Sequence, residues 1–447
     1  MRRIRACPWA EGDATTIADA QWPEYYRVRG PGGKGAILGL GAITMSNRIG
    51  RRSVISVAGL AACIAFWPAL EVRAQETIKF GTALSLTGNL ATEGKQVREG
   101  YDFYVKTVNE RGGIDVAGKK YKVEIVYYDD ESNVNTSVKL YEKLISEDGI
   151  KFLLGPYGSG ITIAVSNVVE QHKLPMVVAH GAASSIYNRG YKYTFGVLNS
   201  IEHYTYNMVK MASEQSPPLK RLALLNENQL FSQLGIDGAA EQAKQFGLEV
   251  VYKEKYSSGT KDLSPELEKM KASRPDMIIA GGYTNDMILL ARQIRQIGLA
   301  PKLLGYLLGP TLPGFVQALG PDAELTLEPV QWSPTVPYED AMFGWTAKGY
   351  AEAFNKVYGH IPDYHPIQSG AALQVFQNAF QKVGGFDPQK VRDAIAATDI
   401  VTAYGPIRFN DKGQNIAKSM SVVQIQDGKP VVVYPADTAE AKLKLRH

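Results

Sequence analysis

The sequence after residue 75 alternates short apolar runs with amphipathic stretches of helical length. The runs are bounded by Gly, Pro or Asp, and the stretches between them repeat their apolar residues with the period of a helix that buries one face. Strand followed by helix in this rhythm predicts a parallel, doubly wound sheet. In the first half, the predicted elements are Ile78–Ala83, Lys95–Arg111, Lys122–Tyr128, Val134–Ser146, Phe152–Leu154, Ile161–His172 and Pro175–Val178.

The same rhythm restarts after Ser200 and predicts a second α/β sheet. Its predicted elements are Ile201–Glu214, Arg221–Leu225, Leu234–Phe246, Glu249–Tyr256, Leu263–Ala272, Met277–Ala280 and Asn285–Gly298. Three helical patterns, near Met342–Tyr358, Ile367–Val383 and Pro388–Ala396, then follow one another without strands between them. Because late helices need a sheet to cover, we expect the chain to return to the first lobe and to end on the second. The predicted lobes are 75–197 with 338–404, and 198–337 with 405–447.

Residues 1–74 differ in composition from the rest of the chain. They hold 10 of the 49 basic residues, 5 of the 45 acidic residues and both cysteines, which leaves 39 basic against 40 acidic residues in 75–447. A body this close to neutral lacks the electrostatic signature of a nucleic-acid binder. Without cysteine, it can form no disulfide, cysteine zinc site or thiol nucleophile.

A secretory signal peptide is predicted at about residues 45–74. Three arginines precede the apolar run 54–70, which is shorter than the ~20 residues of a membrane span, and Ala74 supplies a small residue before the cut. We expect cleavage near Ala74 and export to the periplasm. Two alternatives stay open: lipoprotein anchoring at Cys63, and twin-arginine export through Arg51-Arg52.

Two loops of small residues are predicted at the carboxyl edge of the first sheet. In open α/β sheets, helix N-termini at this edge present free N–H groups to an anion, and Ser159 stands where an N-cap belongs. Ordinary capping and turn formation explain both loops equally well. The candidate ligand contacts in these loops are Tyr157, Gly158, Ser159, Gly181, Ala182, Ala183 and Ser184.

The second sheet offers two aromatic candidates and one acid. Tyr283 follows the strand Met277–Ala280 and Phe231 follows the strand Arg221–Leu225, so both rings should lie near the ligand edge of this sheet. Ordinary packing is the alternative for each ring. Glu324 supplies a carboxylate for an ammonium group, with a solvated surface acid as the alternative.

Local signatures of catalysis are missing. The segment 88–95 imitates a phosphate loop, but five residues separate its glycines and Gln96 stands where Ser or Thr would bind magnesium. No Gly-x-Ser-x-Gly elbow surrounds Ser159, and no histidine or cysteine spacing typical of a metal site occurs. We expect no enzymatic activity, cofactor or metal, although a periplasmic hydrolase or transferase built from distant residues stays open.

Four motifs carry a resemblance that covers nearly all of 76–436. They are IKFGTALSLTG at 78–88, VNERGGI at 108–114, LGPY at 154–157 and PDYH at 362–365. The chain resembles the type I periplasmic solute-binding proteins of ABC transporters, and among them the leucine/isoleucine/valine-type branch. The resemblance implies an α/β fold of two Rossmann-like lobes joined by three crossing strands, with a ligand cleft between them.

The resemblance also implies a site. An amino-acid carboxylate would meet Ser159 and the backbone of 181–183, and an ammonium would meet Glu324, with Tyr283 and Phe231 closing from the second lobe. The chain departs from the branched-chain binders in having Ala183 in place of a threonine, and Glu93 and Phe231 in place of two tyrosines. Gln331 and Trp332, with Tyr364, would line or enlarge a site for an aromatic ligand.

The function that the resemblance implies is that of an exported, non-enzymatic, monomeric receptor. It would capture a branched-chain or hydrophobic amino acid between its lobes and deliver it to an inner-membrane permease. Ligand contacts from both lobes would stabilise the closed state that the permease recognises. The alternatives are the same role for an aromatic carboxylate of the benzoate or cinnamate type or a small amide, and a sensory ligand-binding module.

Overall fold

The first sheet of the protein is built by residues 77–196. The computed structural model describes residues 75–446, so the predicted signal peptide, its cleavage near Ala74 and Cys63 lie outside the described residues. Six strands lie in the order β2-β3-β1-β4-β5-β6, parallel except for the β2–β3 pair. The elements are β1 (Thr77–Leu84), α1 (Ala91–Glu110), β2 (Ile114–Val116), β3 (Lys119–Asp129), α2 (Val134–Ser146), β4 (Phe152–Leu154), α3 (Ser159–His172), β5 (Met176–Val178), α4 (Ser184–Tyr187) and β6 (Thr194–Gly196).

The second sheet has seven strands in the order β15-β14-β11-β10-β9-β7-β8. Its central strands are fully buried, as β9 shows, because helices cover both faces of a parallel sheet. Its elements are η1 (Ile201–His203), α5 (Tyr206–Ser213), β7 (Arg221–Glu227), α6 (Leu230–Phe246), β8 (Glu249–Tyr256), α7 (Ser264–Ala272), β9 (Met277–Gly281), α8 (Thr284–Gln296), β10 (Leu303–Tyr306), α9 (Pro313–Leu319), η2 (Gly320–Ala323) and β11 (Thr326–Val330).

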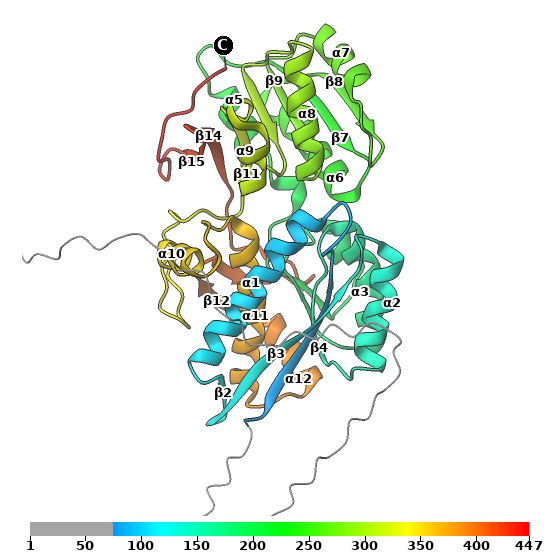
Figure 1. Cartoon of the computed structure of the whole chain (residues 1–447), viewed down its shortest axis with the longest axis vertical. Coiled ribbons are helices and arrows are strands. Elements are labelled where there is room, and N and C mark those ends of the chain that lie inside the picture. The colour runs from blue at the N-terminus through cyan, green and yellow to red at the C-terminus, as the bar shows by residue number, and fades with distance from the viewer. Residues whose placement is uncertain (1–74, 447) are drawn as a thin grey trace, which may run out of the picture. The chain divides into compact units, whose positions relative to one another are not determined.

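After β11 the chain returns to the first sheet, and it ends on the second. Helix α11 packs against α1, α12 packs on α11, and β14 pairs with β11. Figure 1 shows α1 and α11 on one side of the first sheet, with α2 and α3 on the other. These last elements are α10 (Ala347–Tyr358), α11 (Tyr364–Val383), α12 (Pro388–Ala396), β12 (Asp399–Thr402), β13 (Gly405–Arg408), β14 (Ser421–Gln426) and β15 (Lys429–Tyr434).

Two predicted helices are shorter than their patterns. The pattern at Ile201–Glu214 forms the short η1 and then α5. The pattern at Met342–Tyr358 becomes helical only at Ala347, because the Thr346 side chain caps α10 by accepting a hydrogen bond from the Gly349 amide. Residues before this cap form a turn instead.

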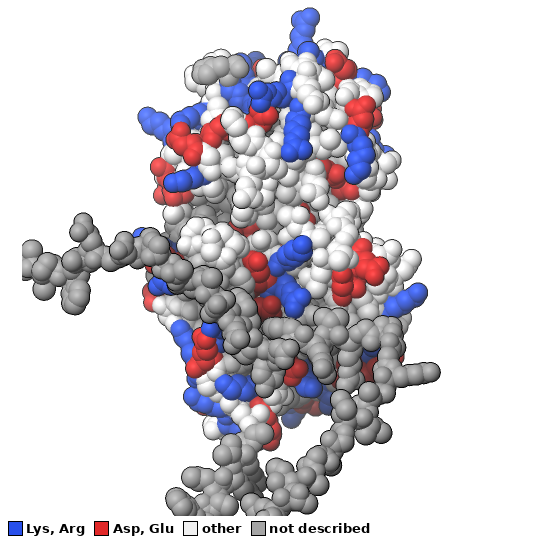
Figure 2. Space-filling model, in the orientation of Figure 1, with Lys and Arg blue, Asp and Glu red and all other residues white. Residues whose placement is uncertain are grey.

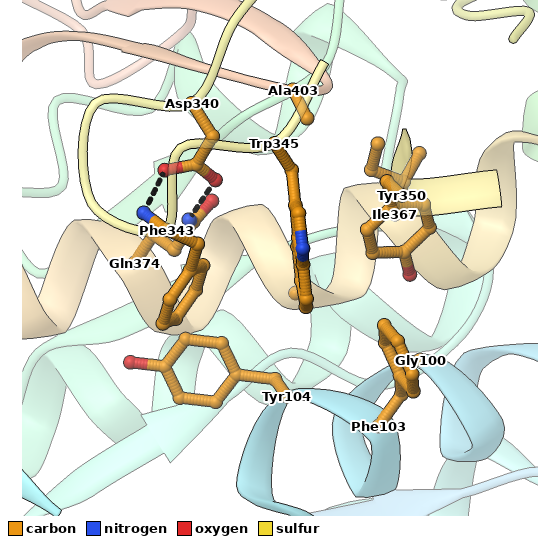
Figure 3. A pocket seen from close by; sticks show the side chains of 11 residues that line it. Gly100, Phe103, Tyr104, Asp340, Phe343, Trp345, Tyr350, Ile367, Gln374 and Ala403 are labelled. Atoms are coloured by element: carbon orange, nitrogen blue, oxygen red, sulfur yellow. Dashed lines mark hydrogen bonds between the residues drawn. The ribbon is translucent and has the colours of Figure 1, made fainter. Parts of the chain in front are cut away.

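That turn belongs to a buried aromatic cluster, which packs the segment before α10 against α1 and α11. The Asp340 carboxylate accepts hydrogen bonds from the Phe343 amide, at 3.0 Å, and from the Gln374 side chain of α11, as Figure 3 shows. The Trp345 ring stacks on Phe103 of α1 with centroids 5.6 Å apart. The cavity among these rings holds about 20 Å³ and is lined by α1, α11 and the returning segment, not by loops that follow strands of both sheets, so we interpret the cluster as packing.

The outer face carries charge of both signs. On the face drawn in Figure 2, basic and acidic side chains are interspersed over both sheets without a large single-sign patch. In the part of the chain that the structure describes, no helix combines the length and apolar character that crossing a membrane requires.

Candidate functional site

A small cavity lies where loops of both sheets meet the N-terminal end of α11. Tyr157 and His180 follow strands of the first sheet, and Phe231 and Tyr283 follow strands of the second, as the ligand edge of parallel sheets requires. Seven of the eleven lining residues carry an aromatic or imidazole ring. The lining consists of Tyr157, Gly158, His180, Ala182, Leu198, Tyr204, Phe231, Tyr283, Tyr364, His365 and Gln368.

The cavity holds about 20 Å³, roughly the space of one water molecule. An amino acid or an aromatic acid is several times larger. Entry of such a ligand therefore requires the two lobes to separate and the lining rings to move, which is the hinge motion that joined α/β lobes perform.

The two loops of the first sheet lie side by side, and hydrogen bonds between them occupy groups that were expected to face the ligand. Gly158 has φ +84°, a conformation that favours glycine, and it places Ser159 at the first position of α3. Ser159 Oγ accepts hydrogen bonds from the amides of Ala182 and Ala183, each at 3.1 Å. These amides are therefore engaged within the protein, and the Ser159 hydroxyl keeps one proton to donate.

Ser159 lacks the partner of a catalytic nucleophile. Among the described residues, the hydrogen-bond partners of Ser159 Oγ are two backbone amides and no imidazole. A serine nucleophile needs a base to take its proton. The loop geometry therefore favours ligand binding over acyl transfer.

The rings of the second sheet stack on each other and reach the first lobe. Phe231 and Tyr283 have centroids 5.7 Å apart at an interplanar angle of 24°. The Tyr283 ring also lies 6.1 Å from the Tyr157 ring of the first sheet. These predicted residues are thus brought together, and aromatic surfaces from both lobes face one small space.

Glu93 links the two lobes directly. It lies in the first turn of α1, is fully buried, and its Oε1 accepts hydrogen bonds from the Thr284 amide, at 3.0 Å, and the Thr284 hydroxyl, at 2.6 Å. Thr284 begins α8, whose N-terminus favours a carboxylate. Glu93 Oε2 is buried without a hydrogen-bond partner among the described residues.

The structure does not bring Glu324 to this cavity. Glu324 precedes β11, at the end of the strand opposite the carboxyl edge, and its carboxylate accepts hydrogen bonds from the amides of Asp427 and Gly428 in the β14–β15 turn. The prediction that Glu324 receives an ammonium in the cleft is therefore wrong. A strand's two ends lie on opposite edges of its sheet, so a residue before the strand cannot share the site of residues after it.

We expect Glu324→Gln to leave ligand affinity unchanged. The glutamine keeps a carbonyl oxygen for the turn amides, so its cost is confined to about 0.5–1.5 kcal/mol of stability. Isothermal titration calorimetry with a solute that binds the wild type measures the affinity, and urea unfolding measures the stability. A tenfold loss of affinity without a loss of stability would return Glu324 to the site.

Four further predicted residues lie beside the cavity lining rather than in it. The Gly181 carbonyl accepts a hydrogen bond from Tyr187, at 2.8 Å, and the Ser184 hydroxyl donates to Glu202. Gln331 donates to the Tyr204 hydroxyl and so positions a lining ring. Trp332 lines a separate groove of about 600 Å³.

Several lining residues were not assigned from the sequence. His180 lies in the second loop, Tyr204 in the segment that crosses to the second lobe, and His365 and Gln368 in α11. Of these, His365 alone belongs to a sequence motif. The Gln368 side chain donates to the Ala179 carbonyl, which fixes the second loop. A PDYH motif at the start of α11 is the one signal that pointed toward this region.

Burial shifts the titration of groups around the cavity. Burial, assisted by the charge of His365, holds the pKa of His180 well below its usual value, so its imidazole is neutral. Burial also raises the pKa of Glu227 to about 7, with the nearby Asp286 carboxylate adding to the shift. The described residues contain no group of three His, Cys, Asp or Glu side chains arranged to hold a metal ion.

The family model described as periplasmic binding protein matches residues 77–430 of the chain. Among curated proteins, the Leu/Ile/Val-binding protein homolog 8 of Brucella abortus (strain 2308) is 27% identical over 387 residues, which cover 83% of this chain and 93% of the relative. Homolog 7 of Brucella melitensis biotype 1 is also 27% identical, over 393 residues, which cover 83% of this chain and 95% of the relative.

Solved structures share the fold. The branched-chain amino acid transporter substrate binding protein LivJ from Streptococcus pneumoniae, in complex with isoleucine, has a TM-score of 0.71 at 23% identity and covers 80% of this chain and 100% of its own. A solute binding protein of an ABC transporter from R. palustris, in complex with benzoate, has a TM-score of 0.69 at 19% identity, with coverages of 82% and 100%.

Proposed function

Because this chain belongs to the periplasmic binding protein family, we propose that it captures a small organic solute outside the cytoplasm and presents it to an ABC permease. The solute would lie between the two lobes, at the cavity lined by Tyr157, Phe231 and Tyr283. Closure would sequester it, and the permease would recognise the closed state. No bond is made or broken in this role.

The class of solute that the geometry supports best is a small aromatic carboxylate. The observation that carries this proposal is the aromatic lining contributed by both lobes, because planar rings stack favourably at centroid distances of 4.5–7 Å. Glu324, the acid that the resemblance assigns to an ammonium, lies at the β14–β15 turn. The benzoate-bound structure from R. palustris demonstrates that this fold accommodates such a ligand.

A hydrophobic amino acid is the second candidate, favoured by Glu93. Its buried Oε2 has no hydrogen-bond partner among the described residues, and a carboxylate oxygen in that position can accept a bond from an ammonium. The isoleucine-bound relative has the same fold. If the solute is an amino acid, Glu93, and not Glu324, would bind its ammonium group.

A thermal-shift screen of ligand-stripped, refolded protein tests the proposal. The panel contains benzoate, 3,4-dihydroxybenzoate, cinnamates, the twenty amino acids and simple amides. A solute that binds only the native state raises the melting temperature in a saturable way. We expect the largest shift from an aromatic acid. A shift confined to amino acids would favour the second candidate, and no shift would contradict the receptor role for these classes of solute. Chemical conversion of a bound solute, checked separately on the recovered ligand, would favour a hydrolase.

A further inference from the structure

Three buried side chains form a hydrogen-bonded chain that ends in the cavity. Asp363 Oδ2 lies 2.7 Å from His365 Nδ1, and His365 Nε2 lies 3.2 Å from the Tyr157 hydroxyl. Asp363, His365 and Tyr157 are 6%, 0% and 5% exposed. His365 and Tyr157 both belong to the cavity lining.

Asp363 determines which way the imidazole is turned. Its Oδ1 caps α11 by accepting a hydrogen bond from the His365 amide, at 2.9 Å, while its Oδ2 faces Nδ1 of the same residue. A carboxylate at Nδ1 keeps a proton there and leaves Nε2 directed at Tyr157.

The Tyr157 hydroxyl can donate a hydrogen bond into the cavity while it accepts one from His365. Burial, followed by the negative charge of Glu93, raises the pKa of Tyr157 well above its usual value, so the phenol keeps its proton. When His365 is protonated, its Nε2–H donates to the Tyr157 oxygen, and the phenolic proton becomes free for an acceptor in the cavity. Bonds in such a chain polarise and strengthen one another.

Several other donors near the cavity are already engaged. The amides of Ala182 and Ala183 bond to Ser159, and the Gln368 side chain bonds to the Ala179 carbonyl. His180 is neutral and pairs with the Ser369 hydroxyl at 2.9 Å. The described lining contains no Lys or Arg, so with His180 neutral, positive charge toward an entering anion requires a protonated His365.

We propose that the Asp363–His365–Tyr157 chain recognises the carboxylate of the solute, with His365 supplying the charge and Tyr157 the hydrogen bond. The proposal rests on the receptor role and names the residues that give it a preference for acids. Glu93, fully buried and close enough to act on Tyr157, sets a negative charge nearby. A bound acid would therefore place its carboxylate toward His365 and any hydrogen-bond donor toward Glu93.

Matched pairs of acid and amide test this chain, because the two members differ in charge but hardly in shape. The pairs are benzoate with benzamide, phenylalanine with phenylalaninamide, and leucine with leucinamide. Each is titrated calorimetrically into the wild type and into His365→Gln, Asp363→Asn and Tyr157→Phe. The ratio of acid affinity to amide affinity is the readout, since a merely structural defect lowers both affinities together.

We expect the preference for the acid to fall by about tenfold to a hundredfold in His365→Gln and in Tyr157→Phe, the loss of one hydrogen bond to a charged group. Tyr157→Phe removes a single oxygen atom and so keeps the test valid if the histidine variant misfolds. Tyr104→Phe is the control: that buried tyrosine of α1 donates to Gln377, at 2.6 Å, outside the lining, and should keep the wild-type ratio.

The outcomes separate the inference from the receptor role. An acid that binds with the same acid-to-amide ratio in wild type, His365→Gln and Tyr157→Phe overturns the inference and leaves the receptor role standing. Failure of every acid and amide to bind the wild type overturns the proposed class of solute, and the inference with it.

Discussion

Replacing Glu93 with alanine is expected to weaken solute binding by about tenfold to a hundredfold. The Glu93 carboxylate accepts two hydrogen bonds from Thr284, at 3.0 Å and 2.6 Å, and these bonds join the two lobes. Hydrogen bonds to a charged group are worth about 1.5–3 kcal/mol, and separation of the lobes would break these two. Their loss shifts the population toward the open state, which holds the solute less tightly. Calorimetric titration measures the change.

Glu110→Ala is the matched control on the same helix. Glu110 is the last residue of α1, is exposed, and pairs with Lys106 one turn away instead of with the other lobe. Exposed pairs of this kind contribute at most about 1 kcal/mol, so binding should not change. Wild-type affinity in Glu93→Ala would mean that this contact does not stabilise the closed form.

Gly100→Ala is expected to cost about 1–3 kcal/mol of stability and to weaken solute binding as well. A Cβ at this position in α1 would lie 2.2 Å from the Pro366 carbonyl oxygen and 2.4 Å from its Cα, so backbone must move. Pro366 lies in the first turn of α11, next to His365. Pushing α11 away from α1 therefore displaces a residue of the cavity lining. Urea unfolding and calorimetric titration report the two effects.

Gly370→Ala provides the comparison within the same helix pair. A Cβ on Gly370 of α11 would meet the Tyr104 Cβ at 4.0 Å, an ordinary contact, so alanine should be neutral or stabilise by about 0.4–1 kcal/mol through the unfolded chain. If Gly100→Ala behaved in the same way, α1 and α11 would not be packed as closely as the structure has them.

Much of the fold was predictable because each sheet is covered on both faces. Buried central strands such as β4 and β9 read as short apolar runs, and the helices between them carry one apolar face. The late helices without strands between them correctly indicated a return to the first sheet, where α11 packs on α1. The strands β10 and β11 were not predicted, because Gly, Pro and polar residues interrupt the apolar runs in and around them.

The site was predictable where it depends on strand direction alone. Tyr157 and Tyr283 each follow a buried strand, and the carboxyl ends of parallel strands meet at one edge. The same rule explains the error at Glu324, because β11 had not been recognised and Glu324 lies before this strand, at the opposite edge of the sheet.

Contacts between distant segments escaped prediction. His365 joins the cavity from α11, some 200 residues after Tyr157, and the two meet only once the chain has returned to the first sheet. The internal bonds of Ser159 were equally invisible, because an N-cap position does not reveal that the following loop turns its amides toward the serine. Such pairings depend on tertiary packing, which local sequence patterns do not encode.

The most direct test of the receptor role is the radius of gyration of the protein in solution, measured by X-ray scattering on ligand-stripped protein before and after saturation with the solute that gives the largest thermal shift. A ligand held between two lobes must close them, so the account predicts that the radius decreases when the solute binds. A solute that binds saturably while the radius stays constant would contradict capture between the lobes.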